Sequence, residues 1–506
     1  MEISRWIDHA AAWDGDRTAL HFEGAEVTYT AFADRISRVA GALRELGIGT
    51  CDRVAYLGYN GPAILELLFA CARLGAALTP LNWRLAAPEY AFILADSTPK
   101  LLFVEDPFYD IAAQVTGKLG AIRCVGLGST QGDWLDYRET VLAAEPLTSA
   151  HTNLGEATVL IVYTSGTTGR PKGAMLPQSA LFWNAVNATL TLSMTRNDHV
   201  LTAIPMFHVG GLNIQTTPAL HLGATVTIAP RFDAGAILAL IAEQRPTLFI
   251  AVPAMIQALI NHPEWQETDL SSLRMFTTGS STIPLPLLRG WLDRDIPVTQ
   301  VYGLTESGPV STVTPVADAE RKVGSCGKPA PYCEARVVDA GDSDVAVDVR
   351  GEILLRGPSV TTGYWNNPQA TAEAFADGGW FRTGDIGHWD DEGYLYIDDR
   401  AKDVVISGGE NVYPAELEDV LAGCLNIAEA AVVGRPDSKW GEVPVAVVVA
   451  RDTRWRDKQA VLDLFEGALA RFKHPKDVVF VDVLPRNSMG KVLKFELREQ
   501  IAATAE

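Results

Sequence analysis

The 506-residue chain has no excess of basic residues, no paired cysteines and no long uninterrupted apolar run. Its net charge of −20 argues against nucleic acid as a general partner. The six cysteines include no CxxC pair, which argues against a zinc site or a disulfide framework and predicts a reducing cytoplasm. The apolar run 63–78 is interrupted by Glu66 and Arg73, so it predicts a core helix rather than a membrane span. Residues 1–6 lack the basic-then-apolar form of a signal peptide.

What is present is the pattern of a multidomain α/β protein, because 506 residues exceed one ordinary core. Residues 25–320 alternate helical spacing, as in 36–43, with short apolar runs such as 53–57 and 101–104. This predicts parallel-rich sheets covered by helices. Residues 320–400 are rich in glycine and short strands and predict a small β-rich subdomain. The last hundred or so residues predict a small α+β domain.

One loop stands out for its hydroxyls, glycines and cations: residues 163–173 read YTSGTTGRPKG. It follows an apolar strand at 157–162. Glycines let backbone N–H groups approach an anion, and hydroxyls and cations add further favourable contacts, so the loop predicts a phosphate site. It is not a Walker A loop, because Pro171 precedes Lys172 and Gly173 follows it.

Four further stretches are each ambiguous alone. In QVYGLTESG (300–308), a Thr-Glu pair at a strand end would suit phosphate and Mg²⁺, or form an ordinary polar turn. In GWFRTGDIG (379–387), Asp385 would suit ribose hydroxyls or be a hairpin-turn aspartate. The mixed-charge stretch 398–411 and the C-terminal stretch PRNSMGKVLK (485–494) are also compatible with solvated surface segments. His208, in PMFHVGG, is equally typical of a core histidine.

In this order and at these separations, the five stretches resemble the AMP-forming adenylate-forming superfamily of acyl-CoA synthetases, firefly luciferase and peptide synthetase adenylation domains. Residues 412–418 (VYPAELE) and 439–442 (KWGE) look most like bacterial fatty-acyl-CoA and feruloyl-CoA synthetases. The resemblance covers essentially the whole chain. It implies an N-terminal AMP-binding domain over 1–401, a mobile C-terminal domain over 402–506 and a hinge at Lys402.

The resemblance also assigns roles to the nucleotide residues. It implies a loop that holds the ATP phosphates, made of Thr164, Ser165, Gly166, Thr167, Thr168, Gly169 and Lys172. It implies that Thr305 contacts phosphate and that Glu306 holds Mg²⁺. It implies an adenine site that includes Gly279, Ser280, Ser281, Tyr302 and Gly303, and a ribose site made of Asp385 and Arg400.

For the acid and the thiol, the resemblance implies that Lys491 bridges carboxylate and α-phosphate during adenylation. It places Gly409 where pantetheine passes and His208 at the junction of acyl pocket and thiol tunnel. The implied acyl pocket is lined by Val209, Gly210, Gly211, Val301 and Pro309. We expect monocarboxylates with an extended apolar or aryl tail to be preferred over acetate and dicarboxylates, because the sequence shows no cation for a second carboxylate.

Three departures from the family pattern bear on the pocket. Val301 replaces a common glycine, Ser280 and Ser281 replace a small apolar pair, and Gly210 stands where plant coumarate ligases carry a tyrosine. The resemblance therefore implies an ATP-, Mg²⁺- and CoA-dependent ligase in the cytoplasm, acting on a medium-to-long fatty acid or a feruloyl-type acid. A homodimer is compatible with the sequence. An enzyme that loads a separate carrier protein, a luciferase-like oxygenase and a non-catalytic nucleotide-binding module are the alternatives.

Overall fold

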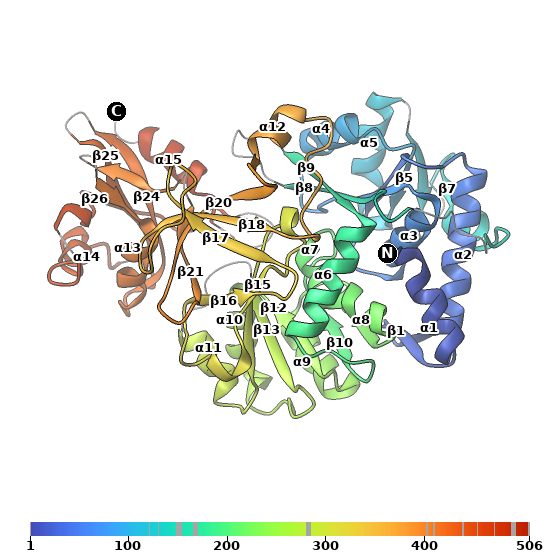
Figure 1. The fold of residues 1–506 in the computed structure, drawn as a ribbon, viewed down its shortest axis with the longest axis horizontal. Coiled ribbons are helices and arrows are strands. Elements are labelled where there is room, and N and C mark those ends of the chain that lie inside the picture. The colour runs from blue at the N-terminus through green and yellow to red at the C-terminus, as the bar shows by residue number, and fades with distance from the viewer. Residues whose placement is uncertain are drawn as a thin grey trace. The chain divides into compact units, whose positions relative to one another are not determined.

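The computed structural model divides the chain into two units, Met1–Ala335 with Leu355–Phe381, and Arg336–Leu354 with Arg382–Glu506 (Figure 1). The structure describes residues 2–120, 122–129, 131–147, 154–164, 171–279, 285–400, 403–407, 410–437, 440–452, 454–469, 471–486 and 492–503. No helix among these residues is long and apolar enough to cross a membrane.

The first unit contains a seven-stranded sheet in the order β7-β6-β5-β3-β4-β8-β9. Every neighbouring pair is parallel except β8 with β9. Helices α4 and α5 bury apolar side chains such as Ile93 and Ala112 against Leu102 and Val104 on this sheet. The strands are β3 (Arg53–Leu57), β4 (Ala77–Pro80), β5 (Leu101–Val104), β6 (Arg123–Gly126), β7 (Leu135–Asp136), β8 (Thr158–Thr164) and β9 (Lys172–Pro177), and the helices are α2 (Tyr29–Glu45), α3 (Pro62–Leu74), α4 (Ala87–Ser97) and α5 (Tyr109–Leu119).

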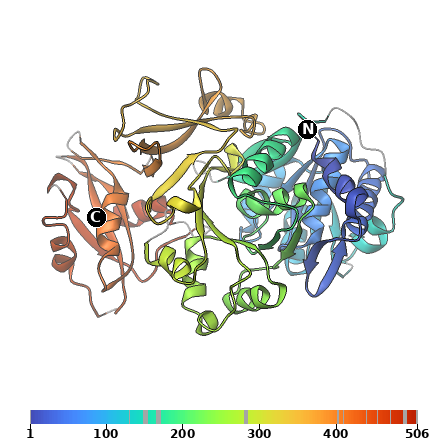
Figure 2. The same ribbon diagram turned by 60° about the horizontal axis from the view of Figure 1, so that its bottom comes forward.

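The second sheet of this unit has the order β16-β15-β14-β13-β12-β10-β11-β1-β2. The six strands from β14 to β1 are mutually parallel, and helices flank the sheet (Figures 1 and 2). The strands are β1 (Thr18–Phe22), β2 (Ala25–Thr28), β10 (His199–Thr202), β11 (Thr225–Ile228), β12 (Leu248–Ala251), β13 (Met275–Gly279), β14 (Val298–Tyr302), β15 (Thr312–Val313) and β16 (Ser325–Pro329), and the helices are α6 (Gln178–Thr191), α8 (Thr217–Leu222), α9 (Ala234–Gln244), α10 (Pro253–Ile260) and α11 (Leu285–Leu292).

The second unit is built around a small sheet in the order β23-β22-β25-β24, with β26 paired to β25. Leu417 and Val461 belong to one of its apolar clusters, and Leu497 and Ile501 of α15 belong to another. The long hairpin of β20 (Trp380–Trp389) and β21 (Leu395–Arg400) comes before it in the chain. The other elements are β22 (Val405–Ser407), β23 (Glu410–Val412), β24 (Ile427–Asp437), β25 (Gly441–Ala450), β26 (Asp477–Phe480), α13 (Pro414–Ala422), α14 (Lys458–Asp463) and α15 (Lys494–Ala503).

The predicted fold class, a mixed α/β protein with parallel-rich sheets, helices and a smaller C-terminal domain, is confirmed. The predicted core helix over 63–78 is present up to Leu74, and the prediction was wrong for the last four residues. There α3 ends at Leu74, Gly75 adopts a left-handed φ of +69°, and β4 begins at Ala77. A continuous apolar run cannot by itself distinguish a buried helix from a buried parallel strand.

Candidate active site

The strand before the predicted phosphate loop and the strand after it lie side by side. β8 ends at Thr164, β9 begins at Lys172, and these two residues pair directly across an antiparallel ladder. Residues 165–170 join them, so the predicted loop residues Ser165, Gly166, Thr167, Thr168 and Gly169 lie outside the described residues. The ladder places the hydroxyl of Thr164 and the cation of Lys172 at the two ends of this connection.

Glu306 lies close to the start of that connection. It belongs to the short 3₁₀ turn Thr305–Ser307 that follows β14, and it is 7% exposed. Its Oε1 atom accepts hydrogen bonds from the Thr164 hydroxyl at 3.3 Å and from the Tyr364 hydroxyl at 3.0 Å. The structure therefore brings together a threonine and a glutamate that are 142 positions apart in the chain.

Tyr364 is a candidate site residue that the sequence did not reveal. Besides its hydrogen bond to Glu306, its ring lies 5.3 Å from the Lys172 ammonium, so it touches both charged groups. Burial and the Glu306 carboxylate raise the pKa of the Tyr364 phenol above its ordinary value, which keeps the hydroxyl a donor. The segment is held nearby because Thr361 donates its backbone N–H to the Glu306 carbonyl at 2.6 Å.

The oxygen atoms around Glu306 suit a hard divalent cation. Both side-chain hydrogen bonds reach Oε1, and Oε2 accepts none from the residues that the structure describes. A nearly buried carboxylate beside the predicted phosphate loop is the kind of ligand that Mg²⁺ uses in nucleotide sites. The donor set at Glu306 therefore fits Mg²⁺ held jointly with substrate phosphates.

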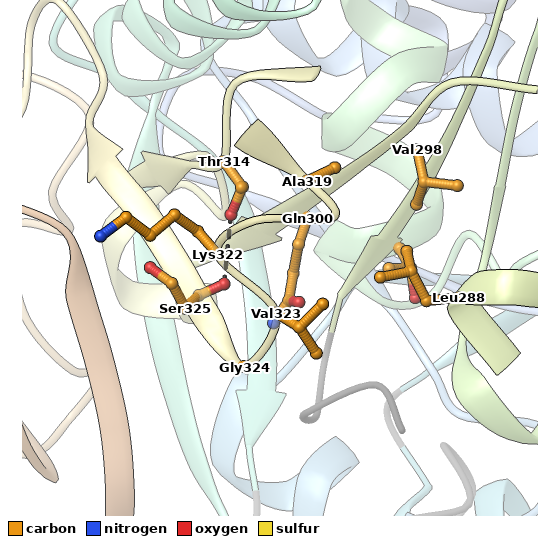
Figure 3. A pocket seen from close by; sticks show the side chains of 10 residues that line it. Leu288, Val298, Gln300, Thr314, Ala319, Lys322, Val323, Gly324 and Ser325 are labelled. Carbon is orange, nitrogen blue, oxygen red and sulfur yellow. Dashed lines mark hydrogen bonds between the residues drawn. The ribbon is translucent and has the colours of Figure 1, made fainter. Parts of the chain in front are cut away.

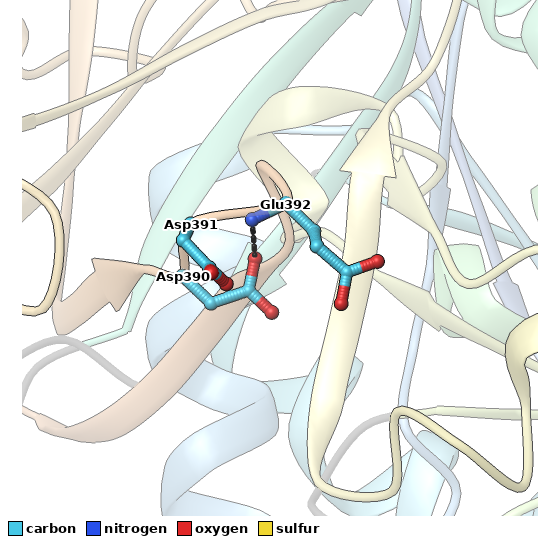
Figure 4. Close-up of side chains that lie close together, drawn as sticks. All are labelled: Asp390, Asp391 and Glu392. Atoms are coloured by element: carbon cyan, nitrogen blue, oxygen red, sulfur yellow. Dashed lines mark hydrogen bonds between the residues drawn. The ribbon is translucent and has the colours of Figure 1, made fainter.

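A second acidic group has a structural explanation. Asp390, Asp391 and Glu392 lie in the turn between β20 and β21, and Figure 4 shows Asp390 accepting from the backbone of Glu392 at 3.0 Å. Asp390 also accepts from the Tyr394 N–H at 2.8 Å, so its carboxylate closes the turn. Asp391 and Glu392 are exposed. The arrangement is that of a solvated hairpin turn.

The predicted adenine residues lie at the carboxyl ends of two adjacent parallel strands. β13 ends at Gly279, which pairs with Val301 of β14, and Tyr302 ends β14. A side chain at Gly279 would approach the Val301 carbonyl to 2.8 Å, and one at Gly303 would approach the Pro309 carbonyl to 2.4 Å. Both glycines are thus required by close backbone packing. Ser280 and Ser281 lie outside the described residues, and contact with adenine stays a prediction.

The predicted ribose residues are paired in the second unit. Arg400 Nε lies 2.9 Å from Asp385 Oδ1, and the two residues face each other across the β20–β21 ladder. Asp385 is buried inside a ten-residue strand, so the interpretation as a hairpin-turn aspartate was wrong. A buried carboxylate fixed by a guanidinium is oriented to accept from neighbouring hydroxyls. Its role with ribose stays a prediction.

His208 begins the helical segment that borders the predicted acyl pocket. Burial and the nearby Arg84 guanidinium lower the pKa of its imidazole to about 4, so it is neutral at physiological pH. The centroid of the Phe207 ring lies 4.8 Å from that of the His208 ring and 6.4 Å from that of the Trp83 ring. The Arg84 guanidinium stacks over the Trp83 ring. Arg84 is a cation near the site that the sequence did not predict.

The two glycines after His208 differ in what they leave open. A side chain at Gly210 would meet only Ile214 Cδ1, at 4.0 Å, so this position has room. A side chain at Gly211 would approach the backbone carbonyls of Pro205 and Ile204 to 2.4 and 2.5 Å. The glycine at 211 therefore serves backbone packing. Of the pair, only Gly210 leaves free space beside the neighbouring Val209.

Three predicted residues of the C-terminal part lie outside the described residues: Lys402, Gly409 and Lys491. Their roles stay predictions. Close to Lys402, the structure describes Asp403, whose carboxylate is paired with the Arg498 guanidinium at 2.5 Å, and Asp399, which accepts from the backbone N–H of Ala415 at 3.1 Å.

A small cavity lies on one face of β13 and β14 (Figure 3). It measures about 10 Å³ and is lined by Thr278, Leu288, Val298, Gln300, Thr314, Ala319, Lys322, Val323, Gly324 and Ser325. That volume suits one water molecule, because a cavity needs roughly 10–15 Å³ to hold one. It is too small for a nucleotide or an acyl chain.

The chain is similar to known proteins in both sequence and structure. The family model of the AMP-binding enzymes matches residues 7–365, and that of the AMP-binding enzyme C-terminal domain matches residues 416–491. The chain is 48% identical to an indoleacetate–CoA ligase of Aromatoleum aromaticum over 503 residues, covering 99% of this chain and 98% of the relative. It is 40% identical to a feruloyl-CoA synthase of an Amycolatopsis species over 498 residues, covering 98% and 99%.

Among solved structures, the chain is similar to the o-succinylbenzoate CoA synthetase of Bacillus subtilis in complex with its acyl-adenylate intermediate. The TM-score is 0.88 and the sequence identity 31%, with 98% of each chain covered. Both the arrangement of elements and the sequence therefore match along nearly the whole length.

Proposed function

Because this chain belongs to the AMP-binding enzyme family and is an acyl-CoA synthetase, we propose that its acid substrate is a monocarboxylate with an aromatic tail. The family forms an acyl-adenylate from ATP and a carboxylic acid, then transfers the acyl group to coenzyme A. We propose that adenylation takes place at Glu306. The main support is that Glu306 is hydrogen-bonded to Thr164 and Tyr364, and that Lys172 lies beside Tyr364.

The first half-reaction joins two anions, so the site has to supply positive charge and fixed geometry. The carboxylate oxygen attacks the α-phosphorus, the bond to the bridging oxygen breaks, and pyrophosphate leaves with that electron pair. We assign Lys172, which lies opposite Thr164 and beside Tyr364, to offset phosphate charge. The Thr164 and Tyr364 hydroxyls hold the Glu306 carboxylate in one orientation. Mg²⁺ bound there would neutralise part of the phosphate charge.

In the second half-reaction the CoA thiolate attacks the acyl carbon, and AMP leaves. We assign His208 to the junction of the acyl pocket and the thiol path. It is neutral at pH 7, so it offers a polar contact without adding a charge. We keep Lys491 as the cation of the first step, Gly409 as the pantetheine contact of the second, and Lys402 as the hinge between domains 1–401 and 402–506.

An aromatic tail is favoured by the surroundings of His208. Tyr59, Trp83, Phe108 and Phe207 form a run of edge-to-face ring contacts with centroids 5.0 to 6.4 Å apart. Gly210 leaves room where a side chain would otherwise stand. Two relatives are named as an indoleacetate–CoA ligase and a feruloyl-CoA synthase, and the acids in both names are aromatic. We therefore place arylacetates and phenylpropenoates ahead of fatty acids.

We propose a cytoplasmic setting on the basis of the thiols. All six cysteines are free, and Cys71, Cys124 and Cys333 have pKa values raised by burial. Unoxidised thiols are typical of a reducing compartment, which supports a cytoplasmic enzyme.

The decisive experiment is a panel of acids assayed for AMP release with and without CoA. Aryl acids should give CoA-dependent AMP release and a thioester product, and should exceed octanoate in kcat/KM. Thioester formation only on an added carrier protein would support the carrier-loading alternative. Light emission with a luciferin, or a fatty-acid preference, would contradict the proposed substrate class.

A further inference from the structure

The helical segment after His208 contains an unusual wide turn. Residues Val209–Gly211 (α7) are α-helical, Leu212–Thr216 (η4) form a π-helical turn, and α8 continues to Leu222. Such π-turns inside α-helices occur frequently at functional sites, because the extra residue redirects side chains. Here the turn lies directly beyond the predicted acyl pocket.

The π-turn places the amide of Gln215 in the interior. Gln215 is 0% exposed, and its Nε2 donates to the Thr277 hydroxyl of β13 at 2.9 Å. Its other amide atom, the acceptor Oε1, has no hydrogen-bond partner in the part of the chain that the structure describes. Buried polar atoms are nearly always paired, so an unpaired acceptor at this position requires an explanation.

Gln215 is next to the groups that define the pocket. Side chains two residues apart on a strand share a face, so Thr277 and Gly279 of β13 face the same way as Val301 of β14. Gln215 meets that face through Thr277. Gln215 is the residue directly after Ile214, and Ile214 is the residue nearest to the open space at Gly210. Gln215 is therefore tied through Thr277 to the face of β13 that carries Gly279, the face it shares with Val301 of β14.

Two other unpaired buried atoms nearby have different surroundings. Thr278 Oγ1 lies on the opposite face of β13, where the residue lines the one-water cavity of Figure 3. Asn213 Nδ2 belongs to a side chain that accepts from Thr217, and its backbone carbonyl accepts from Asn184 of α6. Thr278 points away from the Gly279 face, and among the described residues no hydrogen bond joins Asn213 to that face. Of these three side chains, Gln215 is the one that meets the Gly279 face of β13, through Thr277.

We propose that Gln215 selects aromatic acids whose ring carries an N–H or O–H group, by accepting a hydrogen bond from that group at Oε1. The inference rests on the proposed function, because it concerns the far end of the same acyl pocket. A site built to hydrogen-bond a substrate donor rejects the analogue that lacks it, since the buried acceptor is then left unpaired. The expected discrimination is roughly 10- to 100-fold in kcat/KM.

The test compares indole-3-acetate with 1-benzothiophene-3-acetate, which has nearly the same shape and no N–H group. The wild-type enzyme should favour indole-3-acetate by at least about tenfold in kcat/KM. Gln215→Met removes the amide and keeps the length of the side chain, so the ratio should fall to about one, mainly through loss of activity on the indole acid. With ¹⁵N-labelled indole-3-acetate, the bound N–H proton should shift downfield in wild type and not in the variant.

The matched control is Gln178→Met. Gln178 is also fully buried, but both of its amide atoms are paired, with Ile3 N at 3.0 Å and the Ala72 carbonyl at 2.9 Å. That variant should lose stability and keep the indole preference. Equal loss of both acids in Gln215→Met, or a wild type that converts both acids equally, overturns the role of Gln215. A wild type inactive on every aryl acid overturns the proposed function itself.

Discussion

Removal of one hydroxyl, in Tyr364→Phe, tests whether the contact around Glu306 serves adenylation. The lost hydrogen bond is 3.0 Å long and reaches a carboxylate, and such bonds contribute about 1.5–3 kcal/mol. Thr164 still donates to the same oxygen at 3.3 Å, so the lower end of this range is expected. With 1.36 kcal/mol for each factor of ten, ATP–pyrophosphate exchange should fall about tenfold. The Mg²⁺ concentration for half-maximal exchange should rise, because the carboxylate is less well oriented.

Tyr109→Phe is the matched control. It removes a 2.7 Å hydrogen bond to the Ser129 carbonyl, beside the seven-stranded sheet, and should leave the exchange rate and the Mg²⁺ dependence unchanged. Equal exchange rates and Mg²⁺ requirements in wild type and Tyr364→Phe would refute the assignment. A fall in exchange that matches the fall in melting temperature, and is shared by Tyr109→Phe, would indicate a structural role only.

Three further outcomes are expected. Lys491→Ala should reduce acyl-AMP formation by roughly 10²–10³-fold while sparing thioester formation from supplied acyl-AMP, and equal losses in single-turnover assays of the two steps would contradict this. The pKa of His208 is lower in the folded than in the unfolded state, so His208 should reduce the free energy of unfolding only as the pH falls from 6.5 towards 4. Arg84→Met should raise the pKa of His208, as measured by NMR titration, and an unchanged pKa would refute the charge effect of Arg84. Gly210→Trp should fill the space beside Ile214 and shift the preference in kcat/KM towards shorter acids, and an unchanged preference across an acid panel would refute the pocket assignment.

Local pattern was sufficient for many of the strands. Residues 53–57 and 101–104 form β3 and β5 as predicted. Short, continuously apolar runs are typical of strands in a parallel sheet whose two faces are both covered by helices. The boundary within 63–78 was missed because apolarity continues from α3 into β4, and only Gly75 marks the change. The prediction of parallel-rich sheets also implies that the functional loops lie at the carboxyl ends of the strands.

The site was predictable where motifs carry it and not where distant segments meet. Thr164, Lys172 and Glu306 were identified from their stretches, and the structure brings them near one another. Tyr364 was not, because its contact with Glu306 joins residues 58 positions apart and no local pattern encodes it. Gln215 reads as an ordinary polar residue in the sequence. Only the π-turn and the pairing with Thr277 reveal that one amide atom is left over.

The chain leaves the first unit after Ala335, returns at Leu355, and leaves again after Phe381. Tyr364 lies on this return segment, so the ribosome must synthesise part of the second unit before the first can be completed. A fragment ending at residue 335 would keep Thr164, Lys172 and Glu306 but lack the tyrosine that contacts two of them. Dividing the gene for separate expression or for split-protein reassembly therefore calls for a break beyond β21, because the last passage between the units, at Phe381–Arg382, falls inside β20.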